Sequence, residues 1–584
     1  MERKVSVLAS ILLLLLLAST ADAAIVEETF TIEERTFRIA CGEQVKAVVN
    51  GSLPGPALEA REGDTVIVHV INNSTYNMTI HWHGVFQLYT NWIDGPAYVT
   101  QCPIRPGTSY TNRFNVTGQE GTLFWHAHFS ALRETVYGPI IIRPRIGRNY
   151  PFPKPYREVP ILIGEWFGAN IVELEEQLIT SGGGSTLSDA RTINGAPGPL
   201  YPCSEDDVFR MTVVRGKTYL LRMVNAGLDD HVFFKLAGHT FTVVAVDARY
   251  TRPYRTDVIV LSQGQSADVL FSANQRVGSY YMGARAYSPT VALQFQNGTT
   301  TAIVDYRVAN STNNSTTPMM PVFPDFRDTP IAHRFWSNLT SLTTRSNPHW
   351  SPVPRRVTER MFITVGLGLE PCGGNNTCAN PLGSQYRFSS NLNNVSFLNP
   401  TSISMLEAYY RNISGIFTDD FPDTPPVVFN YTDPRLGIQF PNTSLGPSAP
   451  LVVLEKKATR VKRLKYGAVV NIVLQNTALL AAENHPMHFH GFDFYVLAQG
   501  FGNHDPIRDI FKYNLINPQE RNTIAVPIGG WAVIRFRAIN PGMWFVHCHR
   551  ETHIPWGLAM AILIENGPTP ATSLPPPPPD YPRC

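Results

Sequence analysis

Three copies of one strand pattern constrain the fold of this chain more than any other feature of its sequence. Each copy has a glycine turn followed by β-branched and apolar residues that end near an asparagine: 62–73, 215–226 and 466–477. A second trio follows downstream in the same order: 121–128, 278–285 and 542–549. Registered repeats of this kind predict three homologous β-domains, each a sandwich of short strands.

Length and composition agree with an all-β chain of several domains. The 584 residues exceed what one hydrophobic core supports, and 43% hydrophobic against 16% charged residues is typical of a folded protein. The 47 prolines and 42 glycines favour strands joined by turns. We expect domains at 24–146, 156–308 and 419–567, with a long linker region at 309–418, rich in Asn, Ser, Thr and Pro, and a Pro-rich C-terminal tail at 568–584.

The charge balance argues against two classes of partner. Lysine and arginine number 48 and aspartate and glutamate 46, which gives a formal net charge of +2. A chain this close to neutral has no bulk attraction for nucleic acid or for an anionic membrane. We therefore expect no nucleic acid and no membrane among its partners.

The N-terminus and the glycosylation sequons predict an exported glycoprotein. Arg3 and Lys4 precede an apolar run that is too short to span a bilayer, and small residues follow up to Ala23. Residues 1–23 are thus predicted to be a signal peptide, with an uncleaved anchor as the alternative. Asn-x-Ser/Thr sequons recur at Asn50, Asn73, Asn77, Asn115, Asn297, Asn314, Asn338, Asn394, Asn412, Asn430 and Asn442. We expect N-linked glycans on a secreted protein.

Seven cysteines are an odd number for an oxidising compartment, so one of them has another role. Cys548 lies between two histidines and is the candidate to stay unpaired. The other six allow three disulfides, whose connectivity the sequence leaves open. Cys372 and Cys378 are close enough to close a small loop together.

Ten of the 16 histidines fall in four short clusters: His81 and His83; His126 and His128; His485, His488 and His490; and His547, His549 and His553. Residues i and i+2 of a strand point to the same face, so each His-x-His presents two imidazoles side by side. The second repeat has Gly283 and Arg285 at the equivalent positions. We therefore expect a multinuclear metal site between the first and third domains, with the middle domain as a spacer.

The ligand types indicate copper. Cys548 with His485 and His553 makes a His₂Cys set, which is typical of blue-copper electron-transfer sites. A structural zinc site more often has paired Cys-x-x-Cys, which this sequence lacks. The remaining four histidine pairs are enough for three further coppers, with two histidines on one ion and three on each of the others.

In their order and C-terminal arrangement, the four clusters resemble those of multicopper oxidases of the three-cupredoxin type. The segments 79–85, 92–98, 101–104 and 541–545 are similar to those of plant laccases. The resemblance implies an all-β fold of three consecutive cupredoxin-like Greek-key β-sandwich domains and four copper ions. It assigns the type 1 copper to His485, Cys548 and His553, the type 2 copper to His81 and His488, and the type 3 pair to His83, His126 and His549 and to His128, His490 and His547.

The resemblance also implies a reaction. A laccase couples the one-electron oxidation of phenols, such as monolignols and flavonoids, to the reduction of O₂ to water. Cys548 then accepts electrons and passes them through His547 and His549. Asp94 and Glu551 match acidic positions that the family uses for proton supply, with a structural role as the alternative for each. Leu558 occupies the axial position and cannot coordinate, which favours a laccase over an ascorbate oxidase.

Other interpretations stay open at this level. Another multicopper oxidase, acting on ascorbate or a metal ion, is the nearest alternative, and a non-catalytic cupredoxin protein of the cell wall is the more distant one. Arg550 and Pro199 depart from residues that are usual in the family and affect the expected substrate preference rather than copper loading. We expect a monomer in the apoplast.

Overall fold

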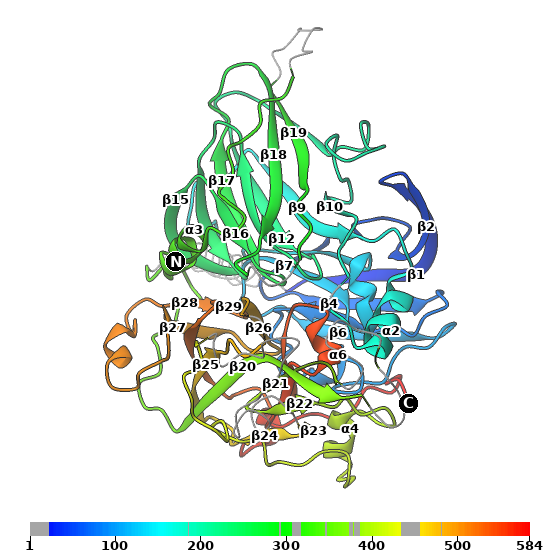
Figure 1. Ribbon diagram of the computed structural model, residues 1–584, viewed down its shortest axis with the longest axis vertical. Coiled ribbons are helices and arrows are strands. Elements are labelled where there is room, and N and C mark those ends of the chain that lie inside the picture. The colour runs from blue at the N-terminus through cyan, green and yellow to red at the C-terminus, as the bar shows by residue number, and fades with distance from the viewer. Residues whose placement is uncertain are drawn as a thin grey trace, which may run out of the picture.

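The structure is a computed structural model that describes residues 23–184, 186–290, 294–306, 317–344, 347–372, 378, 386–433, 456–480 and 482–584. Residues 1–22 of the predicted signal peptide therefore lie outside the described residues. Asn314 and Asn442 also lie outside them. The described residues form six β-sheets, two from each of three successive parts of the chain (Figure 1). The predicted all-β fold of three sandwiches is confirmed.

The first sandwich consists of two four-stranded sheets in the orders β2-β1-β4-β6 and β3-β8-β7-β5. Their inner faces share one core, which is why they pack face to face. The elements are β1 (Ile25–Ile39), β2 (Gly42–Val49), β3 (Leu58–Arg61), β4 (Thr65–Asn72), β5 (Ile80–His83), η1 (Asn91–Ile93), β6 (Ser109–Asn115), β7 (Gly121–Ala127), η2 (Ser130–Glu134) and β8 (Tyr137–Arg143).

The second sandwich pairs a six-stranded sheet, β10-β9-β12-β17-β14-β15, with a five-stranded one, β11-β19-β18-β13-β16. One buried aliphatic and aromatic core joins them. The elements are β9 (Arg157–Trp166), α2 (Ile171–Ser181), β10 (Ala190–Ile193), β11 (Arg210–Val213), β12 (Thr218–Asn225), β13 (His231–Leu236), β14 (Phe241–Val246), β15 (Arg249–Thr256), β16 (Ile259–Leu261), β17 (Ser266–Ser272), β18 (Gly278–Tyr287) and β19 (Thr299–Tyr306).

The third sandwich pairs an eight-stranded sheet, β23-β22-β21-β20-β25-β30-β27-β28, with a five-stranded one, β24-β32-β31-β26-β29. The elements after β19 are α3 (Thr329–Ser337), β20 (Glu359–Pro371), β21 (Tyr386–Leu392), β22 (Val395–Phe397), α4 (Met405–Tyr410), β23 (Lys456–Ala458), β24 (Val461–Leu464), β25 (Val469–Asn476), β26 (His485–Phe489), β27 (Phe494–Phe501), η4 (Asp509–Lys512), β28 (Gln519–Arg521), β29 (Thr523–Val526), β30 (Gly530–Arg537), β31 (Gly542–Cys548), α6 (His553–Trp556), β32 (Ala559–Ile564) and η5 (Pro570–Thr572).

The sheets show why the repeats recur. The first repeat supplies β4, β12 and β25, and each of these strands pairs in parallel with an earlier strand: β1, β9 and β20 respectively. The parallel partner in the third sandwich, Glu359–Pro371, lies inside the segment 309–418 that we predicted to be a linker. This segment therefore contributes a strand to the third sandwich ahead of the predicted domain start at 419.

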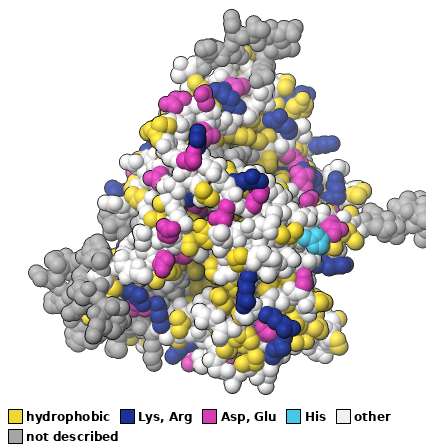
Figure 2. All heavy atoms as spheres, turned by 90° about the vertical axis from the view of Figure 1, so that its right-hand side faces the viewer, with side chains coloured by type: hydrophobic (Ala, Val, Ile, Leu, Met, Phe, Trp, Pro, Cys, Tyr) yellow, Lys and Arg dark blue, Asp and Glu magenta, His cyan; other side chains and the backbone are white. Residues whose placement is uncertain are grey.

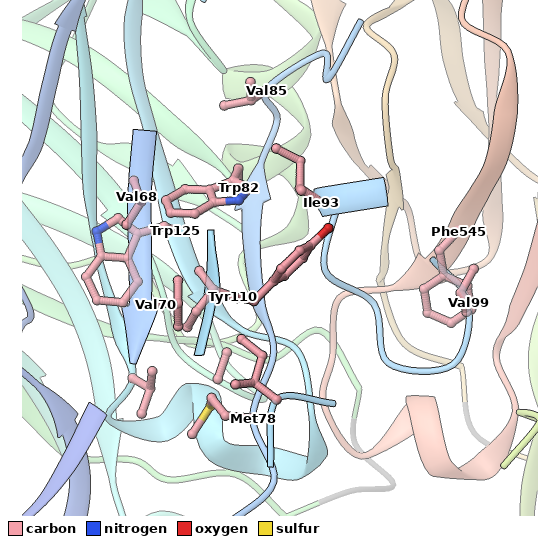
Figure 3. Packing of buried hydrophobic residues seen from close by; sticks show 14 of the residues in the cluster. Val68, Val70, Met78, Trp82, Val85, Ile93, Val99, Tyr110, Trp125 and Phe545 are labelled. Atoms are coloured by element: carbon pink, nitrogen blue, oxygen red, sulfur yellow. The ribbon is translucent and has the colours of Figure 1, made fainter. Parts of the chain in front are cut away.

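A continuous hydrophobic cluster joins the first sandwich to the third. Trp82 and Val99 of the first sandwich belong to the same buried cluster as Met543 and Phe545 of β31. Figure 3 shows this packing, with Phe545 beside Val99. Burial of each such side chain contributes about 1.5–3 kcal/mol. This shared core holds the strands that carry the histidine clusters of the two sandwiches against one another.

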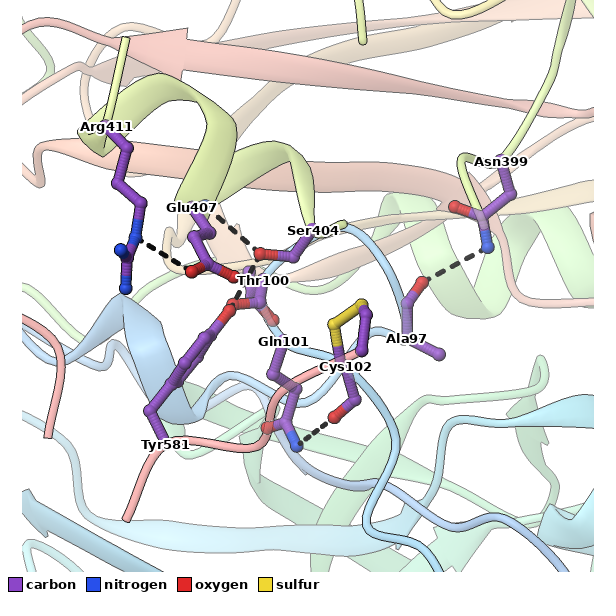
Figure 4. Close-up of a disulfide and its surroundings, with 10 residues drawn as sticks. Ala97, Thr100, Gln101, Cys102, Asn399, Ser404, Glu407, Arg411 and Tyr581 are labelled. Carbon is purple, nitrogen blue, oxygen red and sulfur yellow. Dashed lines mark hydrogen bonds and ion pairs between the residues drawn. A yellow bond between two sulfur atoms is a disulfide. The ribbon is translucent and has the colours of Figure 1, made fainter. Parts of the chain in front are cut away.

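The six paired cysteines form Cys41–Cys203, Cys102–Cys584 and Cys372–Cys378, and Cys548 is free and buried, as expected. Through the second of these bonds the C-terminal tail returns to the first sandwich. The Tyr581 hydroxyl lies 2.7 Å from Ser404 Oγ and donates to the Thr100 carbonyl at 2.9 Å (Figure 4). The tail thus fixes the loop that follows Asp94.

Acidic and basic side chains are interspersed on the face shown in Figure 2, in line with the near-neutral net charge. Among the described residues, we find no helix whose length and apolar character would let it cross a bilayer.

Candidate metal centre

Strand alternation places the histidines of the first sandwich on the side facing the third. On β5, Trp82 is fully buried in the core, so His81 and His83 on either side of it point to the opposite face. β7 pairs with β5 so that His126 lies opposite His81. At the end of β31, Cys548 points into the core of the third sandwich, and its two histidine neighbours point out toward the first.

The eight histidines of the four His-x-His pairs converge at the junction of the two sandwiches. Four contacts join ring nitrogens: His81 Nε2 to His488 Nε2 at 3.4 Å, His128 Nε2 to His547 Nε2 at 3.3 Å, His83 Nδ1 to His549 Nε2 at 3.1 Å, and His490 Nε2 to His547 Nε2 at 3.1 Å. The His126 ring lies 5.3 Å from that of His549, centre to centre. Residues more than 400 positions apart thus form one cluster.

Acceptors outside the cluster fix the orientation of these rings. The Nδ1 atoms of five histidines lie 2.6 to 3.0 Å from oxygen atoms: His81 from the Asp94 carbonyl, His126 from the Ala127 carbonyl, His488 from the Asn522 carbonyl, His490 from the Asp94 carboxylate and His547 from the Cys548 carbonyl. A ring that donates from Nδ1 keeps the Nε2 lone pair free for a metal. His126 Nε2 is buried and has no hydrogen-bond partner among the described residues.

Burial and mutual repulsion keep seven of the imidazoles neutral. Burial, with the charges of neighbouring histidines, holds the pKa well below its usual value in His83, His126, His128, His488, His490 and His549. Burial lowers the pKa of His547 to about 3. Neutral imidazole is the form that binds a metal, so the cluster is prepared for ions without a change of protonation.

A second group lies on the opposite side of β31, inside the third sandwich. Cys548 Sγ is 3.3 Å from His553 Nδ1 and 4.0 Å from His485 Nδ1, and all three residues are buried. Burial raises the pKa of the Cys548 thiol, so a bound cation is needed to keep it as thiolate. Leu558 is fully buried, and its carbonyl accepts from the Cys548 amide at 3.0 Å. Met560 packs in the same core.

Asp94 joins the two halves of the histidine cluster. It follows η1 and is completely buried. Its Oδ2 accepts from His490 Nδ1 at 2.9 Å, and its backbone carbonyl accepts from His81 Nδ1 at 2.6 Å. The loop can come this close because Gly95, at φ +107°, has no side chain. A Cβ there would lie 2.2 Å from the Ile80 carbonyl oxygen.

Comparison with known proteins identifies the family. Three consecutive segments, 31–146, 157–309 and 420–568, match models described as multicopper oxidase, and together they cover most of the chain. The chain belongs to the multicopper oxidase family. Copper is therefore the metal that this oxidase binds, and the donor set just described suits it.

Plant laccases are similar to this oxidase over nearly its full length. Laccase-7 of Arabidopsis thaliana is 53% identical, with 99% of each chain covered. Laccase-6 of Oryza sativa subsp. japonica is 51% identical, with 98% of each covered. The solved laccase of Botrytis aclada has a TM-score of 0.70 at 26% identity, covering 96% of this chain and 90% of the other. These matches establish a laccase-type oxidoreductase.

Glu551 of the oxidase contacts none of the metal-facing nitrogens. Its carboxylate accepts from Arg133 Nη2 at 2.8 Å, and the same guanidinium donates to the His549 carbonyl at 3.0 Å. Burial raises the pKa of Glu551 against the opposing charge of Arg133. A pocket opens beside it and is also lined by Glu175 and Thr552.

Sequence analysis missed the residues that complete the site from other parts of the chain. Arg133 has no local signal, since its partners belong to the other two sandwiches. Gly264, in the second sandwich, has φ +79°, and a Cβ there would lie 2.7 Å from His549 Cδ2 and 2.9 Å from His83 Cε1. The middle domain therefore covers the histidine cluster and is more than the spacer we predicted.

Proposed function

We propose that the oxidase binds four copper ions in the arrangement expected from the sequence. The type 1 ion takes Cys548, His485 and His553. The type 2 ion takes His81 and His488, and the two type 3 ions take one set each: His83, His126 and His549; and His128, His490 and His547. The observation that carries the proposal is that ten of the eleven donors fall in four close-set, largely buried groups, three of histidines and one of Cys548 with His485 and His553, and that the eleventh, His549, contacts His83 at 3.1 Å.

Bound copper would supply one-electron redox chemistry and the reduction of O₂. Overall, four phenols each lose one electron and one proton, and O₂ takes up the four electrons and four protons to give two waters. Cys548 is bonded through the backbone to His547 and His549, so the chain itself provides a covalent path between the two groups. Leu558 packs in the same core as Cys548 and has no donor atom to offer, which would favour a high potential of the type 1 copper.

Two carboxyl groups are placed to supply protons. Asp94 Oδ2 is held by His490, while its Oδ1 has no hydrogen-bond partner among the described residues and lies 3.4 Å from His81 Nδ1, beside the cluster. Glu551 lies beside the pocket described above, and burial raises its pKa against the opposing charge of Arg133. We assign Asp94 to proton delivery at the cluster and Glu551 to proton uptake from solvent.

The substrates that we propose are phenolic small molecules, including monolignols, flavonoids and lignin-related phenols, together with O₂. We also propose a secreted, monomeric glycoprotein of the apoplast. The surface positions of the predicted sequon asparagines that the structure describes support N-linked glycans: Asn394 is half-buried and the others, Asn50, Asn73, Asn77, Asn115, Asn297, Asn338, Asn412 and Asn430, are exposed. Asn72, which also begins an Asn-x-Ser sequon, is buried.

Oxygen uptake tests this proposal. The purified enzyme should be blue, with absorption at ~600 nm from copper–thiolate bonding. It should consume O₂ faster with monolignols than with ascorbate. A Cys548→Ser variant, prepared in parallel, should lose both the colour and the uptake. A preference for ascorbate or for a metal ion would indicate another multicopper oxidase, and a colourless, inactive protein would indicate the non-catalytic alternative.

A further inference from the structure

Arg550, which departs from the residue usual in the family, joins two sandwiches directly beside the cysteine group. Its Nε donates to Asp229 Oδ1 of the second sandwich at 3.2 Å, and its Nη1 binds Glu483 Oε2 of the third. Its side chain is 12% exposed and that of Glu483 only 2%. An ion pair this well buried is a fixed part of the structure rather than a surface contact.

The second oxygen of Glu483 reaches a proposed copper ligand. Glu483 Oε1 lies 2.9 Å from His553 Nε2, and the other nitrogen of that ring, Nδ1, is the atom 3.3 Å from Cys548 Sγ. One series of contacts thus runs from Arg550 through Glu483 and His553 to Cys548. A carboxylate on the outer nitrogen of a metal-binding histidine fixes the ring and makes it a stronger donor.

The second sandwich fixes the Arg550 end of this series of contacts. Thr552 Oγ1 donates to Asp229 Oδ1 at 3.0 Å, and the Glu551 amide donates to the Leu228 carbonyl at 2.9 Å. These two contacts therefore fix the position of Asp229 relative to the segment that carries Arg550. The Arg550 guanidinium fork spans both carboxylates, which a single ammonium on a shorter side chain cannot do.

We propose that Arg550 is a positioning residue: it holds Glu483 against His553 and so sets the reduction potential of the type 1 copper. The inference rests on the type 1 assignment made under Proposed function. Glu483 strengthens His553 as a donor, which stabilises the oxidised ion and lowers the potential. Arg550 keeps Glu483 in that place.

Two roles of Arg550 predict opposite signs. If Arg550 acts only as a positive charge near the copper, its removal stabilises the oxidised ion and the potential falls. If it positions Glu483, its removal releases the carboxylate from His553 and the potential rises, as it does when Glu483 itself is replaced. The sign of the change in the Arg550→Leu variant therefore separates the two roles.

The test is a redox titration of the blue band in the copper-loaded protein. Glu483→Gln and Arg550→Leu should each raise the midpoint potential by about 59 mV. For a one-electron couple this shift corresponds to a change on the order of tenfold in the ratio of oxidised to reduced protein at a given potential. Arg550→Lys should raise it less. Arg508→Leu is the matched control, because it removes an arginine from an exposed ion pair with Asp505 and should change nothing.

The double variant completes the test. If Arg550 acts through Glu483, the Glu483→Gln shift should largely disappear in the Arg550→Leu background. Additive shifts, or a potential that falls in Arg550→Leu, would overturn the inference. Should Arg550→Leu not fold, an unchanged potential in Arg550→Lys overturns it equally. Absence of the blue band in the unaltered protein would instead refute the proposed copper assignment, so the two failures are distinguishable.

Discussion

Replacement of Arg133 should loosen the junction of the three sandwiches. Arg133 lies in η2 of the first sandwich and is 1% exposed. Its guanidinium donates to Glu551 Oε2 from two nitrogens, at 2.8 and 3.1 Å, to the His549 carbonyl at 3.0 Å and to the Gly227 carbonyl at 2.9 Å. One side chain thus binds the third and second sandwiches to the first.

The size of the effect follows from what the substitution leaves behind. Arg133→Met keeps much of the volume but leaves the buried Glu551 carboxylate without its counter-charge and two carbonyls without a donor. Removal of one partner from a buried ion pair costs about 3–5 kcal/mol. Since an uncompensated charge dominates this loss, the double variant Arg133→Met/Glu551→Gln should recover about 2 kcal/mol of it.

Urea unfolding of the copper-loaded proteins measures these differences. Arg143→Met is the matched control, because Arg143 is 28% exposed and pairs with Glu59 and Glu158 near the surface, where such pairs contribute about 0–1 kcal/mol. The reasoning is refuted if Arg133→Met costs no more than Arg143→Met, or if neutralising Glu551 recovers nothing.

Three further changes test Gly264 and Leu558 at the site and Glu520 away from it. Gly264→Ala should lower kcat for phenol oxidation by about tenfold or more, because the new methyl displaces His549; an unchanged rate of O₂ uptake would contradict this. Burial raises the pKa of Glu520 from 4.5 to about 7. The folded protein then keeps a proton that the unfolded chain releases, so stability should fall by roughly 3 kcal/mol as pH rises from about 4.5 to just above 7. Glu520→Gln should flatten that pH dependence of the urea midpoint, and parallel curves would refute the assignment. Leu558→Met should lower the type 1 potential by adding a weak axial thioether, and a redox titration that shows no decrease would contradict it.

The sequence predicted the parts of the site that depend on local geometry. His-x-His on a strand places two rings on one face whatever the rest of the chain does, and the repeats placed those strands in equivalent positions. Cys548 could be predicted to be free from the odd cysteine count together with its place between two histidines. The convergence of the two outer sandwiches followed from the lack of histidines in the middle repeat.

What the sequence did not predict depends on contacts between distant segments. Arg133 and Gly264 act through partners in other sandwiches, and no nearby residue marks them. β20 was assigned to a linker because the region around it is rich in turn-forming residues, although its parallel pairing with β25 makes it part of the third sandwich. Asp94 was expected to supply protons, and only the structure shows that it also holds two of the proposed ligand rings.

Metal analysis of the purified protein tests the central claim most directly. The arrangement of donors predicts four copper ions per chain in the unaltered enzyme and three in Cys548→Ser, because that substitution removes one ligand group and leaves the histidine cluster intact. One copper per chain in the unaltered enzyme, or loss of all copper on replacement of Cys548, would contradict the account.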